Sequence, residues 1–202
     1  TELSAEPTIV FMPPQLLEQT GVAHFELPED ILKILNSETI LSDYNAAVEE
    51  KIIGFLQQAI ATQLHMNLIS GADRALLANL EPATSLMDIG FLANRDELML
   101  HSDWNFPPGQ LMEITQLEDF YFYAYNRHNN TLKNENNLRI VIPLPPARAK
   151  STIVMPVGGY YRRKLIQGPP NTATVFVNGL LHAPPLSNEP QRNILVFDFY
   201  QN

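Results

Sequence analysis

The spacing of apolar positions along the chain changes near Pro82. Before this point apolar residues recur at helical intervals, which predicts a helix beginning at Pro28 and a longer amphipathic helix capped by Ser42 or Asp43. A third, shorter helix is expected over residues 70–81. After Pro82 the helical spacing disappears, and short runs typical of strands replace it. The pattern therefore predicts a mainly helical N-terminal part followed by a β-rich part.

Runs of Asn, Gly and Pro divide the β-rich part into short candidate strands. Residues 1–26 are expected to add one short edge strand followed by a loop. Many short strands at this spacing favour an antiparallel sandwich or barrel, with the helices covering one face of a double sheet in a single domain. The candidate strands are residues 84–92, 96–103, 110–116, 119–126, 138–144, 151–156, 159–166, 172–181 and 191–201.

Composition narrows the chemistry that the chain can carry. Its 202 residues are 45% hydrophobic and 17% charged, which is typical of a globular protein. There are no cysteines, so disulfides, thiolate metal sites and cysteine nucleophiles are excluded, and a metal site would use His, Asp or Glu. The net charge of −9 argues against general nucleic-acid binding.

Hydropathy argues against a membrane protein. No stretch approaches the roughly 20 apolar residues of a membrane span. The N-terminus also lacks the basic and apolar regions of a signal peptide. We therefore expect a cytoplasmic protein without membrane or nucleic-acid partners.

Candidate chemistry begins with His101 and Asp103, which follow the apolar run Leu98–Leu100. Residues i and i+2 of a strand point to the same face, so an imidazole and a carboxylate would project together from one strand end. A second histidine would complete the set of two histidines and one carboxylate that holds Fe(II) and leaves other positions open. Alone, the pair is a common chance pattern, and a strand ending in a polar turn explains it at least as well.

The C-terminal part supplies a second imidazole and a cation. Residues 172–182 predict a strand that ends at His182, and residues 191–200 predict a returning strand that begins near Arg192. The two residues are expected near the same end of a hairpin-like pair. The returning strand is apolar on both faces, which predicts that it is buried on both faces. Burying the Arg192 guanidinium there would cost free energy unless an anion pairs with it. A guanidinium suits a carboxylate, which it binds with two parallel hydrogen bonds.

His101, Asp103, His182 and Arg192 together resemble the motif of the Fe(II)/2-oxoglutarate-dependent oxygenase superfamily. That motif is His-x-Asp, a long interval, a second His, and then an Arg or Lys. The similarity extends over about residues 90–201 and includes the apolar strand before the first pair.

The chain departs from the family pattern at one position beyond the motif. Many members carry a serine two residues after the arginine, where this chain has Ile194. The arginine role survives, because other branches lack that serine too. The second partner of the far carboxylate is therefore unassigned.

The resemblance implies a double-stranded β-helix, the jelly-roll or cupin-like core, over residues 84–202. Residues 1–83 would be mainly helical and packed outside it, within one domain spanning residues 1–202. His101, Asp103 and His182 would hold Fe(II), 2-oxoglutarate would chelate the metal, and Arg192 would bind its far carboxylate. The implied reaction uses O2 to oxidise an unactivated C–H bond of a small molecule, with release of succinate and CO2.

The type of oxidation that the enzyme would carry out and the identity of its substrate follow less directly from the resemblance. Halogenating relatives replace the carboxylate with a small residue, so Asp103 favours hydroxylation, desaturation or ring closure. The short chain favours a small metabolite such as an amino acid. Basic residues are expected on a solvated strand face rather than in a substrate site: Arg139, Arg148, Arg162, Arg163 and Lys164.

Two alternatives remain open from the sequence. One is a cupin-like metalloenzyme that needs no 2-oxoglutarate. Arg192 argues against this alternative, because such an enzyme does not need a cation at that position. The other is a non-enzymatic β-sandwich binding module. The remaining histidines, His24, His65 and His128, are expected to lie away from the metal, with His65 near the end of a helix.

Overall fold

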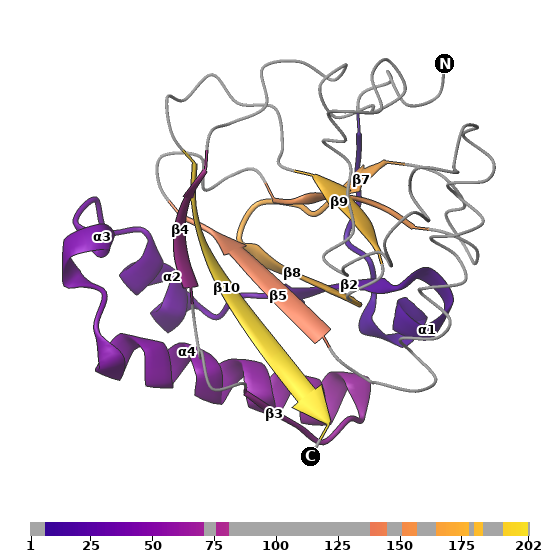
Figure 1. The fold of residues 1–202 in the computed structure, drawn as a ribbon, viewed down its shortest axis with the longest axis horizontal. Helices are drawn as coiled ribbons and strands as arrows, with labels where there is room; N and C mark the ends of the chain where they lie inside the picture. The colour runs from indigo at the N-terminus through magenta and orange to yellow at the C-terminus, as the bar shows by residue number, and fades with distance from the viewer. Residues whose placement is uncertain are drawn as a thin grey trace, which may run out of the picture.

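The computed structural model describes residues 7–70, 76–80, 138–144, 151–156, 165–177, 180–183 and 192–201. These residues form two β-sheets and a group of helices (Figure 1). The strands are β1 (Thr8–Ile9), β2 (Val22–Glu26), β3 (Leu68–Ser70), β4 (Leu76–Leu80), β5 (Leu138–Pro143), β6 (Ile153–Met155), β7 (Ile166–Gln167), β8 (Thr172–Val177), β9 (Leu181–Ala183) and β10 (Arg192–Gln201). The helices are η2 (Pro14–Leu16), α1 (Leu17–Thr20), α2 (Glu29–Leu35), α3 (Ile40–Asp43), α4 (Ala46–Ala59) and the π-helix η3 (Ile60–Leu64). Within the described ranges, no helix combines the length and apolar character needed to cross a membrane.

The larger sheet has the strand order β2-β8-β5-β10-β3, and β4 also pairs with β10. All of these pairs are antiparallel. Every residue of β8 is buried, as the continuous run of apolar and β-branched residues from Thr172 to Val177 predicts for a strand covered on both faces. Among the described residues, this sheet has more strands than the other one.

The smaller sheet has the order β1-β7-β6-β9, in which β1 and β7 are parallel and the other pairs are antiparallel. From β5 onwards the chain visits the two sheets in turn. Strands β5, β8 and β10 belong to the larger sheet, whereas β6, β7 and β9 belong to the smaller one. The C-terminal part is therefore wound between two sheets, as a sandwich requires.

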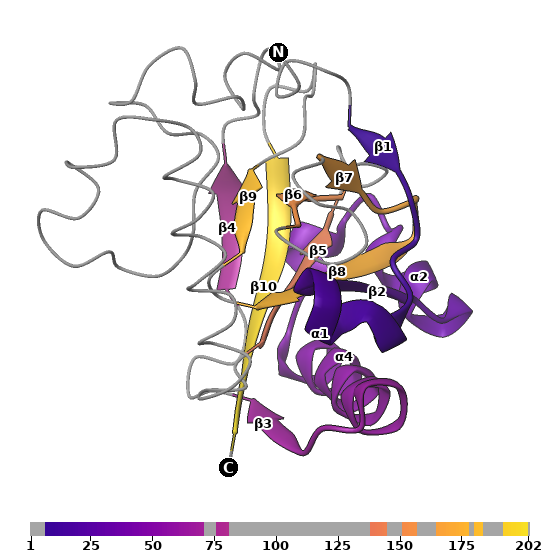
Figure 2. The same ribbon diagram turned by 90° about the vertical axis from the view of Figure 1, so that its right-hand side faces the viewer.

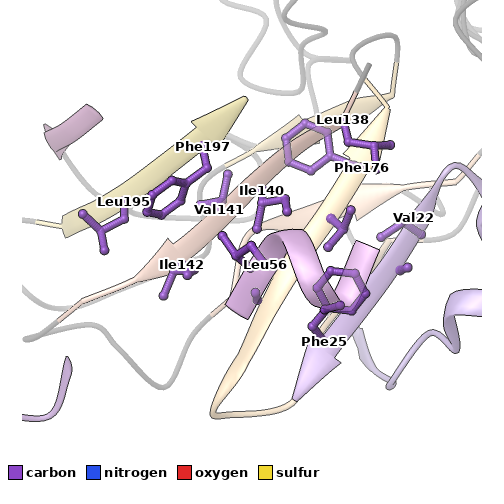
Figure 3. Packing of buried hydrophobic residues seen from close by; sticks show 14 of the residues in the cluster. Val22, Phe25, Leu56, Leu138, Ile140, Val141, Ile142, Phe176, Leu195 and Phe197 are labelled. Carbon is purple, nitrogen blue, oxygen red and sulfur yellow. The ribbon is translucent and has the colours of Figure 1, made fainter. Parts of the chain in front are cut away.

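One face of the larger sheet packs on the helices. The register of the strand pairs places Phe25, Ile140 and Phe197 on the same face of the sheet. Residues paired across neighbouring strands share a face, and so do residues two apart within one strand. These side chains are fully buried in one core with Leu56 of α4 (Figure 3). In α4 the residues Ile52, Leu56 and Ala59 recur at helical spacing and are buried, which confirms the predicted amphipathic helix.

The other face of the larger sheet looks toward the smaller sheet (Figure 2). The ring of Phe176 in β8 lies 4.5 Å, centroid to centroid, from the ring of His182 in β9. Residues in phase with Phe176, including His24 and Val141, therefore share this inner face. The described residues thus form three layers, which are helices, the larger sheet and the smaller sheet.

Several predicted elements agree with the structure. Strands expected over 138–144, 151–156 and 191–201 are found as β5, β6 and β10. The first predicted helix is α2, with Pro28 immediately before it as the N-cap. Candidate strands between residues 84 and 126 lie outside the described residues.

The predicted helix over residues 70–81 is wrong, because the described residues there form β3 and β4. Residues 76–80 pair with residues 192–196 of β10. Pairing with a long central strand outweighs the helix propensity of this Ala- and Leu-rich segment. The expected loop before residue 26 likewise includes the buried strand β2, which pairs with β8.

The start of the long helix and the course of residues 172–181 also differ from prediction. Neither Ser42 nor Asp43 caps α4, since the side chain of Asn45 accepts the amide of Val48 at 3.0 Å. The single strand predicted over residues 172–181 is divided between β8 and β9, which belong to different sheets. The amide of Leu180 donates to the carbonyl of Val177, and this bond closes the turn between them.

Candidate metal centre

The structure describes two of the four predicted site residues in part. His182 is the middle residue of β9, opposite Val154 of β6. Arg192 is the first residue of β10, opposite Leu80 of β4. His101 and Asp103 lie outside the described residues.

The predicted hairpin between His182 and Arg192 is wrong. The two residues belong to different sheets, His182 to the smaller and Arg192 to the larger. Even β8 and β10 are not neighbours, because β5 lies between them. After β8 the chain crosses to the other sheet. The prediction assumed instead that one continuous strand runs up to His182.

His182 is held by two local contacts. Its Nδ1 lies 2.9 Å from the carbonyl oxygen of Leu180, and its ring packs against that of Phe176 with the planes tilted by 41°. The side chain is only 7% exposed. A carbonyl oxygen can only accept, so Nδ1 is the donor in this hydrogen bond.

This hydrogen bond decides what the imidazole of His182 can do. With the proton on Nδ1, the neutral ring carries its lone pair on Nε2. A metal-ligating histidine usually donates its other ring N–H to a carbonyl or carboxylate, which fixes the tautomer. His182 therefore fits a metal ligand that coordinates through Nε2. Within the described ranges no three His, Asp or Glu side chains come together as a metal site.

The inner face beside His182 carries a buried ring and an ion pair. Val22, Phe176, Arg139 and Asp198 lie in register across four strands of the larger sheet. The Arg139 guanidinium binds the Asp198 carboxylate through two hydrogen bonds, Nε to Oδ1 at 2.7 Å and Nη2 to Oδ2 at 2.9 Å. The two side chains are 30% and 24% exposed. Arg139 is thus engaged in a cross-strand pair and is not a solvated surface cation.

Ile194 occupies the position where many members of the resembling superfamily carry a serine. Its side chain is 5% exposed and in phase with Val141 and Asp198, on the inner face of the larger sheet. It offers no hydrogen bond, so the second partner of a bound carboxylate must come from another residue.

A second buried histidine lies on the same inner face. His24 in β2 is fully buried, and its Nδ1 accepts the backbone amide of Met12 at 2.8 Å. The remaining ring proton therefore sits on Nε2, which has no hydrogen-bond partner among the described residues. Burial lowers the pKa of His24 from 6.5 to about 4.

His24 closes one edge of the sandwich. Residues 8–10 pair with β7 of the smaller sheet, and two residues later Met12 pairs with His24 of the larger sheet through both its amide and its carbonyl. A Cβ added to Gly168 would come within 2.7 Å of the His24 ring atoms Cδ2 and Nε2. The ring is therefore enclosed by backbone on two sides, and it is not arranged to bind a metal.

The sequence interpretation placed His24 and His65 away from the metal. His65 ends η3 in a left-handed conformation (φ 56°) and is exposed, as expected for a helix-terminal histidine.

The sequence did not predict the contacts that Phe176 and the Leu180 carbonyl make with His182. The available signal was Asn178-Gly179, a typical turn pair that separates the strand from His182.

Comparisons with known proteins show similarity at the level of fold. No family model matches the chain, and no curated protein matches it in sequence. AviO1 from Streptomyces viridochromogenes Tue57 is 11% identical with a TM-score of 0.50, and the alignment covers 94% of this chain and 93% of AviO1. EvdMO1 is 12% identical with a TM-score of 0.51, over 94% of this chain and 49% of EvdMO1.

The structural matches also include an enzyme whose description names iron and alpha-ketoglutarate. NvfI, described as an iron and alpha-ketoglutarate-dependent endoperoxidase, is 10% identical with a TM-score of 0.49, over 96% of this chain and 82% of NvfI. The chain shares its fold with AviO1 and EvdMO1.

Proposed function

We propose that the protein is a non-heme Fe(II)- and 2-oxoglutarate-dependent oxygenase that hydroxylates an unactivated C–H bond of a small molecule. The observation that carries the proposal is the environment of His182, a buried imidazole whose Nδ1 donates to a backbone carbonyl. With the proton on Nδ1, coordination of iron would use the Nε2 lone pair. His101 and Asp103 would complete the ligand set of two histidines and one carboxylate.

The path of the chain supports a double-stranded β-helix as the core. From β5 to β10 the chain crosses repeatedly between the two sheets, with the strands in the order larger, smaller, smaller, larger, smaller, larger. In this proposal residues 84–137 add the remaining strands, and residues 1–202 form one domain with helices outside the larger sheet. The iron site then lies between the sheets, on the inner face that Phe176 shares.

When bound, iron and 2-oxoglutarate supply the oxidising chemistry, with O2 as co-reactant and succinate and CO2 as products. The protein holds the ligands in place, excludes water and binds the substrate. Arg192 starts the strand that includes Ile194, and strand alternation would bring both residues to the inner face. There its guanidinium would bind the far carboxylate of 2-oxoglutarate with two hydrogen bonds.

The net charge of −9 argues against nucleic-acid partners, and a cytoplasmic location without membrane partners stays a prediction. An amino acid or a related metabolite is the substrate class that we propose to test first. The test is a panel of such compounds with Fe(II), 2-oxoglutarate and air, scored by succinate formation. Asp103→Ala should abolish substrate-dependent succinate, whereas full turnover by this variant would refute the ligand assignment.

Arg192 separates the proposed enzyme from a cupin-like metalloenzyme. Arg192→Ala should weaken 2-oxoglutarate binding to the anaerobic Fe(II) protein by about 2–5 kcal/mol. Arg192→Lys should recover part of this loss, because the charge remains while the two-pronged geometry is lost. A wild-type protein that binds iron but not 2-oxoglutarate would favour the cupin-like enzyme.

A further inference from the structure

Two contacts that orient His182 arise within seven residues of chain. Phe176 and Val177 end β8, the Leu180 amide donates to the Val177 carbonyl at 3.0 Å, and the Leu180 carbonyl accepts Nδ1 of His182 at 2.9 Å. The turn returns the chain so that the imidazole lies over the ring of Phe176. A residue of the larger sheet therefore contacts the proposed ligand in the smaller sheet.

The two contacts restrict different motions of the imidazole. The Leu180 carbonyl selects the Nδ1–H tautomer and limits rotation of the ring about its bond to Cβ. The Phe176 ring, 4.5 Å away and tilted by 41°, supports one face of the imidazole and limits its movement toward the larger sheet. Neither contact alone fixes both the tautomer and the position of Nε2.

Phe176 is itself firmly held. Its side chain is fully buried, and its neighbours in register are Val22 on one side and Arg139, paired with Asp198, on the other. A fully buried ring between paired strands has little room to move, because protein interiors are close-packed. It can therefore act as a fixed support for a neighbouring group.

We propose that Phe176 is a positioning residue that holds the His182 imidazole in the orientation needed for coordination through Nε2. This inference rests on the proposed function. Phe176 does not touch the metal in this account, and it acts only through His182. Substituting it should weaken metal binding without removing a ligand, by about tenfold, as is found for other residues that orient metal ligands.

The chain offers a matched control for this test. Phe25 is also a fully buried phenylalanine of the larger sheet, but its phase places it on the opposite face, toward the helices. Phe25→Leu and Phe176→Leu remove the same atoms from the same core, and only the second alters the contact with His182. If the leucine variants do not fold, Phe176→Met and Phe25→Met repeat the comparison with a side chain of similar volume that adapts better to an irregular space.

The first readout needs no metal. In ¹⁵N-histidine-labelled protein, the ring nitrogen shifts of His182 should show a fixed Nδ1–H tautomer in the wild type and in Phe25→Leu. Phe176→Leu should give a mixture of tautomers and faster exchange of the Nδ1 proton. Equal ring signals in all three proteins would overturn the proposal.

The second readout is anaerobic Fe(II) titration of the same proteins, with His182→Ala as the reference for loss of the ligand. Weakening of about tenfold in Phe176→Leu, with Phe25→Leu close to the wild type, supports the proposal. Equal Fe(II) affinity in the two leucine variants overturns it. Unchanged Fe(II) affinity in His182→Ala would instead refute the proposed function, and the ring signals would still decide whether Phe176 fixes the imidazole.

Discussion

The regions around His24 and His182 contain the same residue type in opposite roles. Both imidazoles are buried, and both lie between the two sheets. Nδ1 of His24 accepts a hydrogen bond from the amide of Met12, whereas Nδ1 of His182 donates one to the carbonyl of Leu180. Nε2 therefore carries a proton in His24 and a lone pair in His182.

This difference separates a structural histidine from a candidate ligand more clearly than burial does. The His24 region joins the sheets, because residues 8–12 cross from one sheet to the other and are fixed at Met12. In the His182 region, the Leu180 carbonyl fixes the tautomer in which Nε2 carries the lone pair. The role of each histidine follows from the backbone group that hydrogen-bonds to its Nδ1, an amide for His24 and a carbonyl for His182.

The largest expected effect concerns the pH dependence of stability at His24. Its pKa is about 4 in the folded protein and 6.5 in the unfolded chain, so the unfolded chain binds the extra proton first as pH falls. Stability should therefore fall between pH 6.5 and pH 4, by about 3 kcal/mol in total, with no further loss from this group at lower pH.

The measurement is urea unfolding across this pH range, with His24→Asn as the comparison. Asparagine keeps an oxygen that can accept the Met12 amide, but it does not titrate. The difference in unfolding free energy between the two proteins should shrink as the pH is lowered. If the difference in unfolding free energy did not change with pH, the buried His24 imidazole would not be neutral as we infer.

A smaller loss of stability is expected from Gly168→Ala. The added Cβ would meet Cδ2 and Nε2 of His24 at 2.7 Å and Oγ1 of Thr172 at 2.9 Å. The imidazole cannot move away without giving up its bond to Met12. We expect destabilisation of about 2 kcal/mol, measured by urea unfolding at pH 7.5.

Gly54→Ala is the control for Gly168→Ala. A Cβ at Gly54 meets nothing within 4 Å, and the residue is an exposed position in α4. This substitution should stabilise the protein by up to about 1 kcal/mol, because alanine is the better helix former. Similar losses in both variants would show that His24 is not tightly enclosed.

The smallest effect on stability is expected at His182. His182→Asn removes the ring contact with Phe176, which contributes about 1 kcal/mol. Urea unfolding of the metal-free protein should show a loss of this size, well below the effects at His24 and Gly168. A loss as large as that of Gly168→Ala would indicate that His182 is mainly a structural residue.

The sequence predicted those features that depend on local patterns. Strands β5, β6 and β10 and the amphipathic helix α4 follow from alternation and helical spacing, which each segment carries by itself. The segment 76–80 was predicted wrongly because its conformation depends on pairing with residues 192–196, far away in the chain. Long-range pairing is not visible in local propensity.

The candidate site was predictable to a similar extent. The order of the motif selected His182, and its geometry is consistent with that role because the contacts to Leu180 and Phe176 are nearly local. The role of His24 was not predictable, because its partner is a backbone amide twelve residues away and gives no sequence signal. The expected hairpin failed because the turn after Val177 changes sheet, although Asn178-Gly179 marked a turn there.

Anaerobic Fe(II) titration of the wild type, His182→Asn and His24→Asn tests the central claim most directly. The wild type and His24→Asn should bind one Fe(II) with equal affinity, since His24 serves only the fold. His182→Asn should bind Fe(II) more than about 100-fold less tightly, a larger loss than residues behind a ligand produce. Equal affinity in His182→Asn and the wild type, or a greater loss in His24→Asn, would contradict the account.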